Sequence, residues 1–152
     1  MNRLNFSISI RAPKEKVWST MLNRNSYQAW TAVFAPGSHY IGNWERGSKI
    51  LFLAPGKSGK MDGMVSRIKE NRKYEFISIE HKGTLLDGKE DTTSEAVKAW
   101  AGALENYTFK ENNGVTELLV EMDSAEDYED MFKNMWPKAL QKLKELAEKK
   151  EL

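Results

Sequence analysis

Apolar and polar residues alternate at the start of the chain. The apolar positions are Leu4, Phe6, Ile8 and Ile10, and polar residues separate them. A period of two residues is typical of a strand with one buried face. Pro13 suits the first turn of a helix, and the helical spacing over 17–22 predicts a short one. A second short helix is expected over 27–33, before Pro36. The chain therefore begins with a strand and two short helices.

Glycine, proline and asparagine divide the middle of the chain into short segments, as expected for an antiparallel meander. The predicted strands cover residues 39–44, 49–54, 60–69, 74–86, 102–110 and 115–122. Asn112-Asn113-Gly114, between the last two, is a strong hairpin pattern. Residues 87–94 are polar and contain glycine, so we expect a loop there, followed by a helical turn over 95–100.

The C-terminal segment has the clearest helical pattern. Apolar residues recur at i, i+3 and i+4 from Tyr128 to Ala147, while Lys and Glu occupy the other face. Pro137 interrupts this stripe, because proline lacks a backbone donor and crowds the carbonyl of Lys133. We expect a kink there, or a short helix followed by a longer one. The half before Pro137 is rich in Met and Phe and is expected to line a hollow, while the Leu-rich half seals the core.

These elements predict the fold class. Strands joined by short turns are antiparallel, and one long helix on such a sheet makes a two-layer α+β domain. A chain of 152 residues is one domain by length and can bury a substantial core. We therefore predict a single domain over residues 1–152, with a curved antiparallel sheet wrapped on a long C-terminal helix.

Composition limits the functions open to this chain. The formal net charge is +1, so no overall field attracts nucleic acid or an anionic membrane. The absence of Cys excludes disulfides, thiolate zinc sites and cysteine nucleophiles, and is typical of a reducing cytosol. No stretch is apolar enough to span a membrane, and the alternating start is not a signal peptide. We expect a cytoplasmic protein that binds no nucleic acid and does not insert into membranes.

Four segments match a known family in order and spacing. They are IRAPKEKVW at 10–18, YQAWT at 27–31, GNW at 42–44 with GSKI at 47–50, and WPKALQKL at 136–143. Together they resemble the START-like (SRPBCC, helix-grip, Bet v 1-like) superfamily. The closest resemblance is to its activator of Hsp90 ATPase (Aha1)-like branch of bacterial domains. The resemblance covers almost the whole chain.

The resemblance implies a sheet of about seven strands that grips the last helix, with a cavity between them. It does not fix an activity, because members bind lipids, polyketides or other apolar molecules, assist chaperones, or have no known ligand. The sequence departs from the family pattern in its polar segment 87–94 and in Ala101-Gly102-Ala103 after Trp100. Both departures affect the mouth of the expected cavity.

Aromatic and methionine residues are the candidates for the cavity wall. Trp18 is expected in the core, and plain packing is the alternative for the other aromatic residues. Methionine adapts to irregular shapes but is also common in cores. Ser78, Tyr107 and His81 are the candidate polar groups. The predicted ligand-binding residues are Trp30, Phe34, Trp44, Phe52, Met64, Phe76, Ser78, Trp100, Tyr107, Met131 and Met135.

Three functions remain open. The first is non-catalytic binding of a small apolar ligand between the sheet and the last helix, and the second is a protein-interaction or chaperone-accessory module without a ligand. The third is a cyclase- or hydrolase-type enzyme, which needs a titratable group in the hollow, hydrogen-bonded to a second polar group. Neither His39 nor His81 belongs to a metal or catalytic motif. We favour ligand binding, with no catalytic residue, metal or cofactor, in a monomer or weak dimer.

Overall fold

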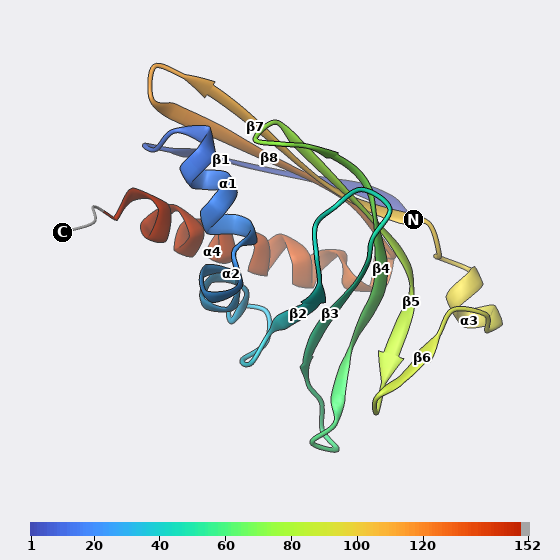
Figure 1. The fold of residues 1–152 in the computed structure, drawn as a ribbon. Coiled ribbons are helices and arrows are strands. Elements are labelled where there is room, and N and C mark those ends of the chain that lie inside the picture. The colour runs from blue at the N-terminus through green and yellow to red at the C-terminus, as the bar shows by residue number, and fades with distance from the viewer. Residues whose placement is uncertain (150–152) are drawn as a thin grey trace.

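The computed structural model describes residues 1–149 as an antiparallel sheet curved around one long helix (Figure 1). The elements are β1 (Asn2–Ile10), α1 (Lys14–Leu22), α2 (Arg24–Thr31), β2 (His39–Gly42), β3 (Lys49–Pro55), β4 (Met61–Arg72), β5 (Phe76–Leu86), β6 (Lys89–Asp91), α3 (Glu95–Lys98), β7 (Ala103–Asn112), β8 (Val115–Ser124), a 3-10 turn (Glu126–Tyr128) and α4 (Glu129–Glu148). The predicted α+β helix-grip architecture is confirmed.

The sheet pairs the first strand of the chain with its last strand. Its strand order is β1-β8-β7-β5-β4-β3-β2, and β6 pairs with β5. The pairing of β1 with β8 runs from Asn2 opposite Ser124 to Ile10 opposite Thr116. The helix α4 lies across the concave side of the sheet and packs against β1, α1 and α2 (Figure 1). The sheet and α4 therefore form two layers, and α1 and α2 close one end.

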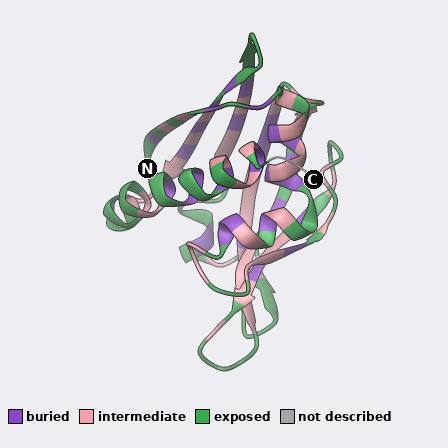
Figure 2. Cartoon of the chain, turned by 90° about the vertical axis from the view of Figure 1, so that its left-hand side faces the viewer, coloured by how far each residue is buried: buried purple, intermediate pink, exposed green. Residues whose placement is uncertain are grey.

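The core lies between the sheet and the second half of α4. Inward-facing segments of both layers are buried (Figure 2). Its most deeply buried residues include Ile10, Val17, Ile77, Ile79, Leu118, Val120, Ala139, Leu140 and Leu143. Trp18 joins them, as predicted, and its ring lies 5.2 Å from the ring of Phe109. This end of the molecule is filled by side chains.

The segment 87–94 is not wholly a loop, contrary to the sequence prediction. Residues Lys89–Asp91 form β6, with Thr84 opposite Asp91 and Leu86 opposite Lys89. The pairing of β5 with β7 covers only Phe76 to His81, so the far end of β5 would otherwise expose backbone donors and acceptors on that side. β6 pairs with that edge through its backbone, which requires no apolar alternation in its sequence.

The helix α4 continues unbroken through Pro137. Of the two outcomes expected there, the division into two helices is therefore wrong, while the kink stays a prediction. A short 3-10 turn does precede it, but at Glu126–Tyr128 rather than at the proline. Proline forfeits one hydrogen bond to the carbonyl of Lys133. Trp136 and Leu140 on either side of it are buried, and most helical stability in proteins comes from such packing. Burial of the apolar face therefore maintains the helix across the proline.

The turn between β7 and β8 has the geometry that its sequence predicts. Asn113 and Gly114 both have positive φ angles, 53° and 79°. Two consecutive positive φ angles define the type I′ turn, whose twist matches that of an antiparallel strand pair. This turn fixes the register in which Asn112 faces Val115.

Candidate functional site

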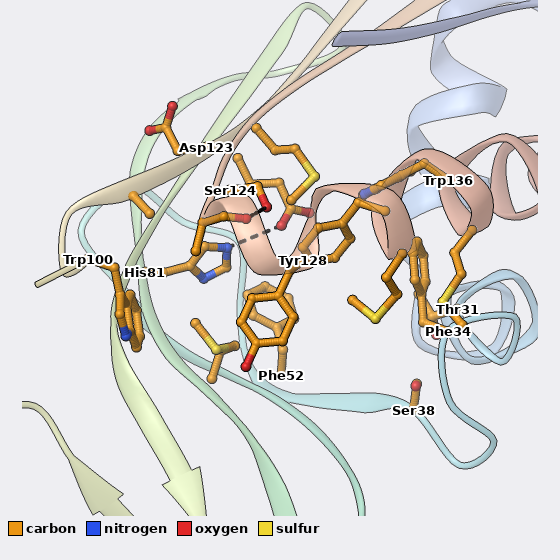
Figure 3. A pocket seen from close by; sticks show the side chains of 18 of the residues that line it. Thr31, Phe34, Ser38, Phe52, His81, Trp100, Asp123, Ser124, Tyr128 and Trp136 are labelled. Carbon is orange, nitrogen blue, oxygen red and sulfur yellow. Dashed lines mark hydrogen bonds and ion pairs between the residues drawn. The ribbon is translucent and has the colours of Figure 1, made fainter. Parts of the chain in front are cut away.

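A cavity lies under the first half of α4. Its volume is about 530 Å³, which falls within the range of roughly 300–1,000 Å³ typical of small-molecule sites. Side chains from α2, the sheet, the 3-10 turn and α4 surround it (Figure 3). Tyr128, in the 3-10 turn, and Met131, in the first turn of α4, are 58% and 41% exposed. Met1 also borders the cavity and is 60% exposed. The cavity is therefore open to solvent on the side of these residues.

Eight of the eleven predicted residues border this cavity. They are Trp30, Phe34, Phe52, Met64, Trp100, Tyr107, Met131 and Met135. They come from α2 and the segment after it, from β3, β4 and β7, from the segment after α3 and from α4. The fold therefore brings together side chains that are far apart in the sequence. That these residues bind a ligand stays a prediction.

The other three predicted residues do not border the cavity. Phe76 and Ser78 lie on the opposite, convex face of the sheet, because side chains alternate along β5 and Ile77 and Ile79 occupy the core face. Trp44 does not border the cavity but packs against residues that do. Its ring packs on the rings of Tyr40 and Phe52, at 5.3 and 5.7 Å, and of these three residues only Phe52 borders the cavity.

Trp136 marks the boundary between cavity and core. It is 3% exposed and borders the cavity. Four aromatic rings, those of Phe6, Trp30, Phe34 and Tyr107, lie 5.0–6.2 Å from its own. No residue of α4 beyond Trp136 borders the cavity, and the buried apolar side chains of that half, Ala139, Leu140, Leu143 and Ala147, are packed in the core. The helix thus serves the cavity before the proline and the core after it.

A hydrogen-bonded polar cluster lies on the sheet side of the cavity. The ring of His81 is directed into the cavity (Figure 3). Its Nε2 lies 3.1 Å from Oε1 of Glu105, and its Nδ1 is hydrogen-bonded to the hydroxyl of Ser66 at 2.7 Å. The hydroxyl of Tyr107 donates to the other carboxylate oxygen, Oε2 of Glu105. His81, Glu105 and Tyr107 border the cavity. Its wall therefore has one polar region within an otherwise largely apolar lining.

The carboxylate of Glu105 affects the phenols around it. Burial raises the pKa of Tyr107 well above its ordinary value, and the negative charge of Glu105 raises it further. The same two causes, burial first, raise the pKa of Tyr27 on the opposite wall. Both phenols therefore remain protonated and able to donate hydrogen bonds at neutral pH.

Glu105 is the main residue that the sequence prediction missed. It lies on β7 between Ala103 and Tyr107, which face the same side of the sheet. Its side chain is only 18% exposed. A charged residue on the apolar face of a predicted strand was the available indication, since charges are seldom buried without partners. The cluster therefore centres on Glu105.

The residue types Ser66, His81 and Glu105 also occur in nucleophilic hydrolases. Here Ser66 is 1% exposed and does not border the cavity, so its hydroxyl cannot contact a molecule held there. Both ring nitrogens of His81 are already hydrogen-bonded. The presence of His81 in the cavity fits the expectation for an enzyme, but the burial of Ser66 leaves the cluster without an accessible nucleophile.

Within residues 1–149, no three His, Cys, Asp or Glu side chains are grouped so that they could hold a metal ion. None of the helices in that range is both long and apolar enough to cross a membrane.

The sequence of the chain matches a known family. A family model described as "Activator of Hsp90 ATPase homolog 1-like protein" matches residues 11–148. No curated protein matches the sequence. Among solved structures, the Aha1 dimer from Colwellia psychrerythraea has a TM-score of 0.73 at 16% identity, with 97% of both chains covered.

Two other structures show the same fold. A Cytophaga hutchinsonii protein has a TM-score of 0.72 at 19% identity, with 97% of this chain and 94% of that chain covered. DynU16, from the dynemicin biosynthetic locus, has a TM-score of 0.70 at 14% identity, with 97% of this chain and 48% of that chain covered. At these identities the structures establish the fold alone, whereas the sequence match spans most of the chain. The chain belongs to the family of activator of Hsp90 ATPase homolog 1-like proteins, within the START-like superfamily.

Proposed function

We propose that the protein binds a small apolar molecule in the cavity under α4, without catalysing a reaction on it. The observation that supports this proposal is the cavity itself, about 530 Å³ in volume and walled mainly by aromatic and methionine side chains. Each ~100 Å² of apolar ligand surface removed from water contributes about 2.5 kcal/mol before the costs of association.

The walls combine rigid and adaptable parts. Trp30 is buried, and its indole Nε1 donates to the carbonyl of Met21 at 3.0 Å, which fixes the ring. Met64, Met131 and Met135 are unbranched side chains that fill irregular shapes. A site of this kind fixes one side of a ligand and adjusts to the other, which fits binding of related molecules of varied shape.

The alternatives have less support. A protein-interaction or chaperone-accessory role rests on the family name, and an enzymatic role rests on the His81–Glu105 pair, which lacks an accessible nucleophile. We also propose a cytoplasmic location, from the absence of Cys, and a monomer or weak dimer. The Colwellia psychrerythraea relative is described as a dimer.

A titration with the neutral dye N-phenyl-1-naphthylamine tests the proposal. Dye fluorescence should rise and saturate with the unmodified chain, because apolar burial increases its emission. Ala103→Phe places a ring into the cavity, since Ala103 borders it, and should abolish the rise. The matched control is Thr108→Phe, on the opposite face of the same strand β7, which should bind like the unmodified chain.

Two outcomes would contradict binding of the dye in the cavity. Dye emission that does not saturate, or that persists in Ala103→Phe at the affinity of Thr108→Phe, would show that the dye binds elsewhere. Circular dichroism of both variants verifies that each is folded before its binding is interpreted.

A further inference from the structure

Besides phenols, the ionisable groups that border the cavity belong to His81, to Glu105 and Asp123, and to Met1, whose α-amino charge acts on Asp123. Among residues 1–149, no Lys or Arg borders the cavity. Asp123 is already paired, because its Oδ1 lies 2.9 Å from Nε of Arg3 and its Oδ2 accepts from the backbone N–H of Leu104 at 2.9 Å. Glu105 has no comparable guanidinium or ammonium partner among the described residues; its salt-bridge contact is with His81.

The partners of Glu105 leave room for another donor. A carboxylate has about four lone-pair directions, and two side chains, His81 and Tyr107, donate to it, one to each oxygen. With a neutral imidazole, the Glu105–His81 pair carries one negative charge, and with imidazolium it is neutral. In neither state does the pair attract an anion.

Resting on the proposed function, we infer that the ligand is an apolar molecule with a head group that donates hydrogen bonds, an amine or an alcohol, and that carboxylates such as fatty acids are rejected. The head group lies against Glu105 and donates to its free lone pairs, while the apolar body fills the space between Trp30, Phe52 and Met135. A carboxylate in the same position would face the charge of Glu105. No Lys or Arg side chain of the described residues borders the cavity to offset that repulsion, and the α-amino charge of Met1 acts on Asp123.

Three probes with the same ten-carbon chain isolate the head group. Decylamine, decanol and decanoate are titrated into the full chain at pH 7 by isothermal titration calorimetry, below their micelle concentrations. Decylamine and decanoate each carry one charge, so their difference reports the sign that the cavity prefers. We expect decylamine and decanol to bind at least about tenfold more tightly than decanoate, because like charges brought together cost several kcal/mol.

Two charge-neutralising variants test whether the charge of Glu105 causes the preference for decylamine and decanol over decanoate. Glu105→Gln keeps the shape of the side chain and should bring decanoate to within about threefold of decylamine. Glu117→Gln removes the same charge from an exposed position on β8, outside the cavity, and should preserve the order of the three affinities.

The results separate this inference from the proposed function. If decanoate binds to the unmodified chain as tightly as decanol and decylamine, the head-group selection is wrong while apolar binding stands. An unchanged preference in Glu105→Gln would likewise refute the role of Glu105. If none of the three probes binds, apolar binding itself fails, and the inference fails with it. Should Glu105→Gln not fold, the three affinities of the unmodified chain still decide between these outcomes.

Discussion

Replacing Trp136 by alanine tests the division of α4 between cavity and core. Trp136 is almost fully buried among four aromatic rings. Burying about 200 Å² of its surface at about 25 cal/mol per Å² gives about 5 kcal/mol as an upper estimate. Large-to-alanine substitutions of buried Trp and Phe cost roughly 3–5 kcal/mol. We therefore expect Trp136→Ala to lower the free energy of unfolding by about 4 kcal/mol.

The control lies on the same helix and borders the same cavity. Met131 is 41% exposed, so Met131→Ala should cost less than about 1 kcal/mol. Urea unfolding followed by circular dichroism measures both variants without relying on tryptophan emission. For a domain of this size, about 4 kcal/mol also lowers Tm by roughly 8–16 °C. Equal costs for the two variants, or a loss under about 1.5 kcal/mol for Trp136→Ala, would refute the assignment of Trp136 to the core boundary.

Two further predictions concern glycine residues of the sheet and its turns, and the buried phenols. Gly114→Ala should lower the free energy of unfolding in urea by about 1–2 kcal/mol from its positive φ alone, since an added Cβ meets no atom within 4 Å. Gly63→Ala should cost more, because its Cβ would lie 1.8 Å from the carbonyl oxygen of Phe52. Equal costs for the two variants would contradict this difference. The raised pKa values of Tyr27 and Tyr107 mean that the contribution of these two phenols to the free energy of unfolding is constant below about pH 10, the pKa in unfolded chains, and is lost at higher pH. Ultraviolet titration should show these two phenols ionising only as the chain unfolds, whereas immediate ionisation of all five tyrosines would refute the effect.

Local patterns predicted the helices and the long strands well, because each depends on its own residues. Alternation from Leu4 to Ile10 and the Asn113-Gly114 turn require no distant partner to be recognised. The short strand β6 was missed for the opposite reason. Its residues are polar, and it forms only because the end of β5 offers an unpaired edge. The continuity of α4 through Pro137 also depends on the sheet beneath it.

The cavity was harder to predict than the fold, because one residue of register changes the face of a strand. Phe76 and Ser78 were placed in the lining although Ile77 and Ile79 hold the inner face. Tyr107 lies two residues from Glu105 on β7, whereas His81 comes from β5 and becomes a neighbour of Glu105 only through strand pairing. Sequence alone therefore predicted the apolar character of the cavity and two of its polar residues, Tyr107 and His81, but not Glu105, which joins them.

The pairing of β1 with β8 has a consequence for how the protein is made. Roughly 120 residues separate Asn2 from its partner Ser124. At about 5–20 residues per second, a ribosome needs on the order of ten seconds to supply the second strand. During that time Phe6 and Ile8 belong to a strand without its neighbour, and the closing contact is among the least local in the fold. Contacts of such long range slow folding, so the first strand synthesised is among the last to be incorporated into the sheet.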